Sequence, residues 1–384
     1  MSIAMRIPAS ELSWVLEWEA IKGEKGRKKI GKRSGSAAGK VYCGRTEKLL
    51  ASEGSRGKLK EVTAVEMKSF EKSHVGVCYG SLGDNLPPPH EVIHLYKHNN
   101  IPRMRIYSPL PHVLQALRGS NIEVMVGVAN EDLCHIATNM ANAYSWVHNN
   151  IRNYAKVNFR YIAVGNEIHP PAWEANHLLG AMKNIHRAIS EAGLGNQIKV
   201  STPFSTEILG ESYPPSKGSF KPHMGSFINP IIRFLVDTHA PFFLNMYTYF
   251  SYIGSPHLIS LEYALFTSPG VVVHDGQFGY QNIFDAVLDA AYSALEKAGG
   301  GSLEIVVAET GWPSAGGLAS TVENARTYNT NLLRHVKGGT PKRPGKPIQT
   351  YLFSMFNENK KEPAFEKHWG LFYPNKQPVY HTRN

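Results

Sequence analysis

Two glutamates each follow a short apolar run and precede turn residues. Glu167 ends the segment Tyr-Ile-Ala-Val-Gly-Asn-Glu, and Glu309 follows Ile-Val-Val-Ala and precedes Thr-Gly-Trp-Pro. Continuously apolar runs are typical of strands buried on both faces of a parallel sheet, and parallel α/β proteins carry their chemistry at the C-terminal ends of such strands. A buried carboxylate is costly without a partner, so a single one could equally be a structural ion-pair residue. Two at matching strand ends favour a paired acid/base or acid/nucleophile function.

The elements that position these glutamates follow from the apolar pattern along the chain. Segments with helical spacing, among them 283–295 and 325–336, alternate with strand-like runs and stop at glycines. Alternation of this kind predicts βαβ units, and eight repeats predict a closed (β/α)8 barrel, the TIM barrel, of about 250 residues or more. Glu167 then ends the fourth strand and Glu309 the seventh, so both face one mouth. The strand-like runs are 75–80, 103–108, 123–128, 159–167, 198–204, 242–250, 304–311 and 347–358.

Residues 1–74 differ in composition from the barrel, 75–384. They contain 16 Lys or Arg and 9 Glu, a net charge of +7 out of the chain's +10. We expect a basic, disordered extension. The stretch 22–33 could serve as a nuclear address or nucleic-acid patch, but no aromatic residues interleave to stack on bases, so no nucleic-acid partner is expected. Three glutamates in the first 20 residues interrupt any apolar core, so no signal peptide is predicted.

Several other classes of protein are disfavoured. No run approaches the roughly 18 apolar residues of a membrane span, so no membrane association is expected. Cys43, Cys78 and Cys134 are widely spaced and odd in number, and they predict neither a disulfide framework nor a zinc site. The chain contains no phosphate loop, G-x-S-x-G elbow or dinucleotide fingerprint, so no cofactor is expected.

One motif is typical of zinc enzymes. The segment 90–94, His-Glu-Val-Ile-His, matches H-E-x-x-H, in which two histidines one helical turn apart bind the metal. In a barrel this segment would form the first crossover helix, on the outer ring and away from the mouth. Lys97 and Asn100 also stand where a metzincin needs Gly and His. We therefore expect surface histidines at His94 and His98, and no metal.

Two carboxylates at a barrel mouth, without metal or cofactor, suit glycoside hydrolysis. One carboxylic acid protonates the leaving oxygen, and the other carboxylate attacks the sugar or activates water. Asn166, directly before Glu167, could hydrogen-bond a sugar hydroxyl. Aromatic rings gather at the other strand ends, where they could stack on pyranose faces, although each alone could equally be core packing. These rings are Tyr79, Tyr107, Tyr247, Tyr249, Tyr252, Trp312 and Phe356.

The chain resembles the plant endo-1,3-β-glucanases of glycoside hydrolase family seventeen over nearly all of 75–380. The motifs that carry the resemblance are Val-Gly-Val-Cys-Tyr-Gly at 75–80, Asn-Asn-Ile-Pro-Arg-Met-Arg-Ile-Tyr at 99–107, Ala-Val-Gly-Asn-Glu at 163–167, Tyr-Ala-Leu-Phe-Thr-Ser-Pro-Gly at 263–270, Glu-Thr-Gly-Trp-Pro-Ser at 309–314 and Met-Phe-Asn-Glu-Asn-Lys-Lys at 355–361. The resemblance implies a (β/α)8 barrel and retaining hydrolysis, with Glu167 as the acid/base and Glu309 as the nucleophile. It also implies a charged cluster beside the pair, formed by Glu358, Lys361 and Glu366, and it adds Arg105 and Asn245 to the substrate-binding residues.

The same resemblance implies a biological setting. The expected substrate is β-1,3-glucan, such as callose, laminarin or fungal wall glucan, cleaved at internal bonds by a monomeric, secreted enzyme of carbohydrate metabolism and plant defence. The expected compartment is the cell wall, the exterior or the vacuole. Three alternatives stay open: a β-1,3/1,4-glucan hydrolase on the same barrel, a catalytically impaired glucan-binding protein, and a basic intracellular interaction protein driven by residues 1–74.

The chain also departs from the family pattern. The stretch 168–180 is shorter than usual after the acid glutamate, which we expect to reshape one wall of the cleft. Thr248 stands where the family usually has proline, which we expect to loosen a substrate-contacting loop. The resemblance begins abruptly at His74 or Val75, and an incorrectly joined upstream exon would explain the basic extension.

Overall fold

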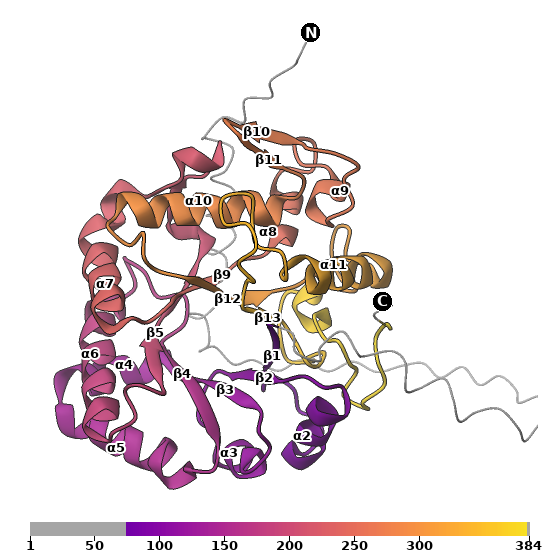
Figure 1. Cartoon of the computed structure of the whole chain (residues 1–384). Helices are drawn as coiled ribbons and strands as arrows, with labels where there is room; N and C mark the ends of the chain where they lie inside the picture. Colours follow the sequence, from indigo (N-terminus) through magenta and orange to yellow (C-terminus); the bar gives the residue numbers. More distant parts are fainter. Residues whose placement is uncertain (1–73, 382–384) are drawn as a thin grey trace, which may run out of the picture.

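The strands form a parallel barrel surrounded by helices (Figure 1) in this computed structural model, which describes residues 74–381. Neighbouring strands pair in the order β5-β4-β3-β2-β1-β13-β12-β9-β6, and every pairing in this sheet is parallel. The (β/α)8 prediction is confirmed. The strands are β1 (Val75–Tyr79), β2 (Arg103–Ile106), β3 (Glu123–Val128), β4 (Asn158–Val164), β5 (Lys199–Ser201), β6 (Pro203–Ser205), β9 (Phe242–Asn245), β12 (Ile305–Thr310) and β13 (Thr350–Leu352).

The fifth predicted strand, 198–204, is divided into two short strands, which together close the ring. β5 pairs with β4, while β6 pairs with β9, and only Thr202 separates the halves. Pro203 begins the second half, and because proline has no N–H to donate, a continuous ladder cannot run through this position. The nine strands of the sheet therefore correspond to the eight predicted segments.

The sequence prediction was wrong about where several strands end. The segment 159–167 is strand only as far as Val164, so Glu167 lies in the turn after β4. The segment 242–250 is extended only as far as Asn245, and helix α8 begins at Thr248. The segment 347–358 contributes only β13 to the sheet. A short aromatic, apolar run fits a buried helix as well as a buried strand, and periodicity alone does not separate them.

The outer helices include both of those predicted from the 3.6-residue spacing. The segment 283–295 lies in α10, whose first turn is capped by the Asn282 side chain accepting from the Asp285 N–H. The segment 325–336 lies largely in α11. The helices are α2 (Pro89–His98), α3 (Pro111–Leu117), α4 (Leu133–Thr138), α5 (Met140–Asn150), α6 (Ala175–Glu191), α7 (Gly225–Thr238), α8 (Thr248–Gly254), α9 (Leu261–Ala264), α10 (Ile283–Lys297) and α11 (Val322–His335).

Two short antiparallel hairpins extend the connections between barrel units. β7 (Leu209–Glu211) pairs with β8 (Ser219–Phe220), and β10 (Val273–Asp275) pairs with β11 (Phe278–Tyr280). In Figure 1 the second hairpin lies beyond α10, at the edge of the molecule.

The H-E-x-x-H segment lies on α2, the first outer helix, as expected. His94 and His98 are exposed and stack on each other, and Glu91 forms an ion pair with Lys376. Within residues 74–381, no cluster of three potential metal ligands occurs. Over the same residues, no helix has the length and apolar character to cross a membrane. The predicted disorder of the basic extension concerns residues outside the described range.

Candidate active site

A tight turn after β4 presents Glu167. Gly165 has φ +66° and Glu167 has φ +54°, a left-handed conformation that costs a residue with a side chain about 1 kcal/mol or more. Neighbouring segments hold this turn. The Asn130 side chain accepts from the Asn166 N–H (2.8 Å) and donates to its carbonyl (3.2 Å), and the Glu167 N–H donates to the carbonyl of Pro203 (2.9 Å). The turn is therefore fixed by β3–α4 residues on one side and by β6 on the other.

Glu309 lies on β12, where it forms an ion pair with one side chain and accepts hydrogen bonds from two others. Its Oε1 atom is 2.9 Å from Nη1 of Arg105 and 2.8 Å from the Tyr107 hydroxyl, and its Oε2 atom is 2.5 Å from the Tyr247 hydroxyl. Glu309 is 6% exposed and Arg105 1%. The cation and the two hydroxyl donors hold both oxygens of the carboxylate in fixed positions.

The neighbouring groups keep the protons that these hydrogen bonds need. Burial, and then the charge of Glu309, raises the pKa of Tyr247 well above its usual value. Burial, Cys78 and then Glu309 do the same for the pKa of Tyr107. For Arg105, burial acts to lower the pKa, but Tyr107 and Glu309 outweigh it and raise the pKa. Both phenols thus remain donors to Glu309, and the guanidinium remains its cationic partner.

Asn245 connects the two glutamates. Its Nδ2 atom donates to Oε1 of Glu167 (3.0 Å) and to Oδ1 of Asn166 (3.1 Å). Its own Oδ1 atom accepts from Nη1 of Arg105 (3.0 Å), and Nη2 of Arg105 donates to Asn166 (2.6 Å). Asn245 therefore links Glu167 to the guanidinium that pairs with Glu309.

A cleft of about 660 Å³ crosses the mouth of the barrel over both glutamates. The lining of one arm includes 205–207 after β6 and Phe250, Ser251, Ile253 and Gly254 of α8. The other arm includes 80–82 after β1, which lies far from β6 in the strand order of the barrel. Phe353 and Trp369 add apolar surface between the arms. The cleft is the size of a pocket for a small ligand and is lined by aromatic and polar groups, as carbohydrate recognition requires.

The predicted charged cluster lines the same cleft. Nζ of Lys361 is 3.6 Å from a carboxylate oxygen of Glu358 and 3.6 Å from one of Glu366, and it lies 4.0 Å from the centre of the Phe353 ring. Glu358 is 2% exposed and accepts from the Leu82 N–H (2.7 Å). The cluster places a cation on the cleft wall, held between two carboxylates.

Residues 75–383 match the family model described as Glycosyl hydrolases family 17. The chain belongs to glycosyl hydrolase family 17. It is 53% identical over 328 residues to a glucan endo-1,3-beta-glucosidase, basic vacuolar isoform, of Nicotiana plumbaginifolia, covering 84% of this chain and 89% of the relative. It is 57% identical over 311 residues to a glucan endo-1,3-beta-glucosidase of Vitis vinifera, covering 80% and 90%.

Two solved structures share the barrel at high sequence identity. A structure from a study of two plant beta-glucan endohydrolases with distinct substrate specificities is 48% identical, with a TM-score of 0.77 over 79% of this chain and 98% of that one. CJP38, a beta-1,3-glucanase and allergen of Cryptomeria japonica pollen, is also 48% identical, with a TM-score of 0.77 over 80% and 97%.

Within this family 17 barrel, the predicted substrate-binding residues separate into three groups. Tyr107, Asn166, Asn245 and Tyr247 line the cleft. Arg105 lies beneath it and contacts Glu309 instead. The remaining four are buried in aromatic packing beside the cleft, where rings meet edge to face. These four are Tyr79, Tyr249, Trp312 and Phe356.

Several cleft residues of this hydrolase were not singled out from its sequence. Phe250 and Trp369 lie in the lining, although the first falls in a run predicted as strand and the second follows the charged cluster. The polar run 205–207 also lines the cleft, and its place directly after a predicted barrel strand was the signal that could have identified it. Asn130 is found only from its contacts, since nothing in its sequence neighbourhood marks it.

Thr248, which stands where the family usually has proline, holds its loop by a side-chain hydrogen bond. It is buried at the first position of α8, and its hydroxyl donates to the carbonyl of Ala264 in α9 (3.3 Å). Proline is favoured at a first helical position because its φ is preset, and here a side-chain hydrogen bond holds the same turn.

Proposed function

We propose that this family 17 hydrolase cleaves internal β-1,3-glucosidic bonds of β-1,3-glucans with retention of configuration. Glu309 acts as the nucleophile, and Glu167 acts as the acid/base. The observation that carries these roles is that both glutamates line one cleft, where Glu309 pairs with Arg105 and accepts from two phenols, and Glu167 accepts from the Asn245 amide. The substrate class is supported by relatives that are 50–57% identical and carry the name glucan endo-1,3-beta-glucosidase.

The first step forms a glycosyl-enzyme. Glu167 donates its proton to the glycosidic oxygen as the bond to the anomeric carbon breaks, and Glu309 attacks that carbon through an oxocarbenium-like transition state. Arg105 and the two phenols orient the Glu309 carboxylate towards that carbon. In the second step Glu167, now a carboxylate, takes a proton from water, which displaces Glu309 and restores both groups.

The shape of the cleft supports attack inside a chain. Its lining continues from 205–207 on one arm, across both glutamates, to 80–82 on the other. A glucan chain can thus extend to both sides of the bond that is cleaved. Polar side chains on both arms offer hydrogen bonds to hydroxyl groups, and Phe250 and Trp369 offer ring faces.

Laminarin hydrolysis followed by proton magnetic resonance tests the proposal. The first-formed products should be oligosaccharides rather than glucose, and the new reducing end should appear as the β-anomer. An initial α-anomer would contradict the nucleophile role, and glucose as the first product would contradict internal cleavage. Binding of laminarin without any product would favour the impaired glucan-binding alternative. Faster cleavage of mixed β-1,3/1,4-glucan than of laminarin would favour the mixed-linkage alternative.

We also propose that the enzyme acts in the vacuole or outside the cell, as a monomer, in defence against walls that contain β-1,3-glucan. Relatives named as vacuolar isoforms support the compartment. A fluorescent fusion to the full chain tests it, because a nuclear or cytosolic signal would contradict this location. Light scattering of the purified protein tests the monomer.

A further inference from the structure

The cleft contains a carboxylate that the proposed mechanism does not use. Glu207 lies in the short 3-10 helix Thr206–Ile208, directly after β6, and lines the cleft together with Ser205 and Thr206. Its side chain is only 6% exposed. A carboxylate that is withdrawn from bulk water yet faces a ligand cleft is costly to maintain unless donors approach it. Its position on the cleft wall allows those donors to come from a ligand.

The connection after Glu167 supplies one neighbour of this carboxylate. Nε2 of His169 lies 3.4 Å from Oε2 of Glu207, and the His169 side chain is 30% exposed. Nδ1 of His169 lies 3.0 Å from the carbonyl of Pro170. The Pro170 carbonyl and the Glu207 carboxylate both only accept hydrogen bonds, so the ring donates to both when Nδ1 and Nε2 each carry a proton. The ring is therefore held on both sides and orients the carboxylate.

The segment that carries Glu207 is hydrogen-bonded to the turn that presents Glu167, the proposed acid/base. The Glu167 N–H donates to the carbonyl of Pro203 in β6, two residues before Ser205. The Ala172 N–H donates to the carbonyl of His169 (3.0 Å), which makes the start of the β4–α6 connection a compact turn. The carboxylate of Glu207 is thus part of the wall next to the bond that would be cleaved, on the arm of the cleft opposite 80–82.

We infer that Glu207 binds hydroxyl groups of a glucosyl unit in this arm of the cleft, with His169 as its positioning residue. The inference rests on the proposed function. Sugar hydroxyls are good donors, an ionised carboxylate is an acceptor with two oxygens, and hydrogen bonds to a charged group are about twice as strong as neutral ones. Ser205 and Thr206 add hydroxyls that can donate or accept beside it.

Substitution of Glu207 by glutamine tests the inference on β-1,3-gluco-oligosaccharides of increasing length. Glu207→Gln keeps the shape and removes the charge, so kcat/KM should fall roughly ten- to hundredfold on substrates long enough to reach this arm, with a smaller fall on the shortest ones. Glu211→Gln is the matched control, since Glu211 is exposed on β7 and lies outside the cleft lining. It should leave kcat/KM unchanged at every length.

The role of His169 has its own readout. His169→Ala should raise KM for long oligosaccharides more than it lowers kcat, because the carboxylate loses its orientation while the catalytic pair is untouched. His169→Gln places an amide nitrogen near the position of Nε2 and should restore much of the affinity. If His169→Gln behaves like His169→Ala at every length, His169 does not position Glu207.

Calorimetric titration separates this inference from the proposed function. In a Glu309→Gln background, which removes the nucleophile, a β-1,3-gluco-hexasaccharide should bind roughly ten- to hundredfold more weakly once Glu207→Gln is added. Equal affinities with and without Glu207→Gln, or losses in kcat/KM that do not depend on length, would overturn the inference. Failure of the unmodified enzyme to cleave any β-1,3-glucan would instead overturn the proposed function, while the titration would still report on Glu207.

Discussion

Arg105 and Glu309 form a buried ion pair beneath the cleft, with Nη1 of Arg105 2.9 Å from Oε1 of Glu309 and side chains that are 2% and 8% exposed. The guanidinium also donates to Asn245, to Asn166 and to the carbonyl of Ala308. One cation therefore organises both carboxyl groups of the proposed pair, directly for Glu309 and through the two amides for Glu167.

Removal of this cation should affect both stability and turnover. Arg105→Met leaves the buried Glu309 without its counter-ion, and breaking such a pair costs about 3–5 kcal/mol. Urea denaturation should show that loss, and laminarin hydrolysis should be abolished. Arg103→Met is the control, because Arg103 pairs with Glu123 at a partly exposed site where an ion pair contributes about 0–1 kcal/mol. Equal losses from the two substitutions would contradict a special role for Arg105.

The Tyr247 hydroxyl should contribute to turnover. Tyr247→Phe removes one of the two phenol hydrogen bonds to the Glu309 carboxylate, and a hydrogen bond to a charged group corresponds to roughly a ten- to hundredfold change in rate. The measurement is kcat/KM on laminarin, which should fall by about that factor. Tyr249→Phe alters a buried phenol beside the cleft and should leave kcat/KM unchanged. An unchanged kcat/KM in Tyr247→Phe would show that its hydroxyl does not support the nucleophile.

The two glutamates should differ when the leaving group is varied. Glu167→Gln loses proton transfer, a contribution of about 10²- to 10⁴-fold on natural substrate, but an aryl β-1,3-glucoside with an activated leaving group needs little protonation. That variant should therefore still release a burst of aryl alcohol, whereas Glu309→Gln should release none. A burst from Glu309→Gln instead would reverse the two assignments.

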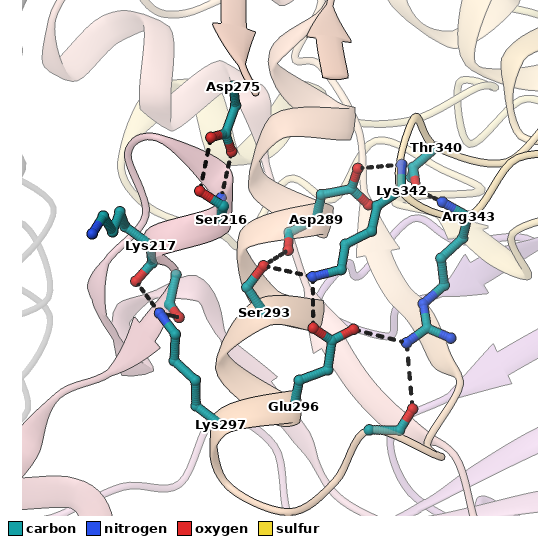
Figure 2. A network of polar contacts seen from close by, with 12 residues as sticks. Ser216, Lys217, Asp275, Asp289, Ser293, Glu296, Lys297, Thr340, Lys342 and Arg343 are labelled. Atoms are coloured by element: carbon teal, nitrogen blue, oxygen red, sulfur yellow. Dashed lines mark hydrogen bonds and ion pairs between the residues drawn. The ribbon is translucent and has the colours of Figure 1, made fainter. Parts of the chain in front are cut away.

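A second buried carboxylate should make stability depend on pH. Asp289 lies on α10 and accepts from the Lys342 N–H (2.9 Å), while the Lys342 ammonium turns towards Glu296 and Ser293, as Figure 2 shows. Burial raises the pKa of Asp289 from 3.8 to about 6. The folded state then holds a proton that the unfolded state has already lost, so this contribution to stability is complete below about pH 4 and disappears as the pH rises through about 6.

The rise of about two units in the pKa of Asp289 corresponds to about 3 kcal/mol in the free energy of unfolding. Asp289→Asn resembles the protonated acid at every pH. Denaturation of the parent and the variant at pH 4, 5, 6 and 7 should show the difference in unfolding free energy moving in favour of the variant as pH rises. A difference that stays constant would mean that Asp289 does not titrate in this range.

The domain boundary proposed from composition also has a direct test. The family match begins at residue 75, and the carbonyl of His74 accepts from the Thr350 N–H (3.0 Å) at the start of the β1–β13 pair. A chain that begins at His74 should therefore fold and hydrolyse laminarin like the full chain. Loss of the thermal transition or of activity would show that residues before His74 belong to the folded unit.

The sequence by itself determined the barrel and the two carboxylates. Most strands lie in local runs rich in apolar residues, and the 3.6-residue spacing of the longer outer helices is readable within about 11 to 18 residues. Because parallel strands end at one face, Glu167 after β4 and Glu309 on β12 had to meet at one mouth, however far apart they lie in the chain.

The tertiary structure alone decided which side chains surround them. On a continuous strand, Tyr247 and Tyr249 would point to the same face, because strand side chains repeat every two residues. Since α8 begins at Thr248, Tyr247 stays in the cleft and Tyr249 turns into the core. The turn into a helix depends on packing against segments distant in sequence, which a local pattern does not contain.

Charge pairing was decided in the same way. Arg105 reads as one more strand residue in the sequence, and its partner Glu309 lies 204 positions later. Only closure of the ring brings β2 and β12 close enough for the guanidinium to reach the carboxylate beneath the cleft. Similarly, His169 and Glu207 come together because the β4–α6 connection lies against the segment after β6. Closure of the barrel determines which charged side chains come into contact. The sequence shows only which charged residues are present.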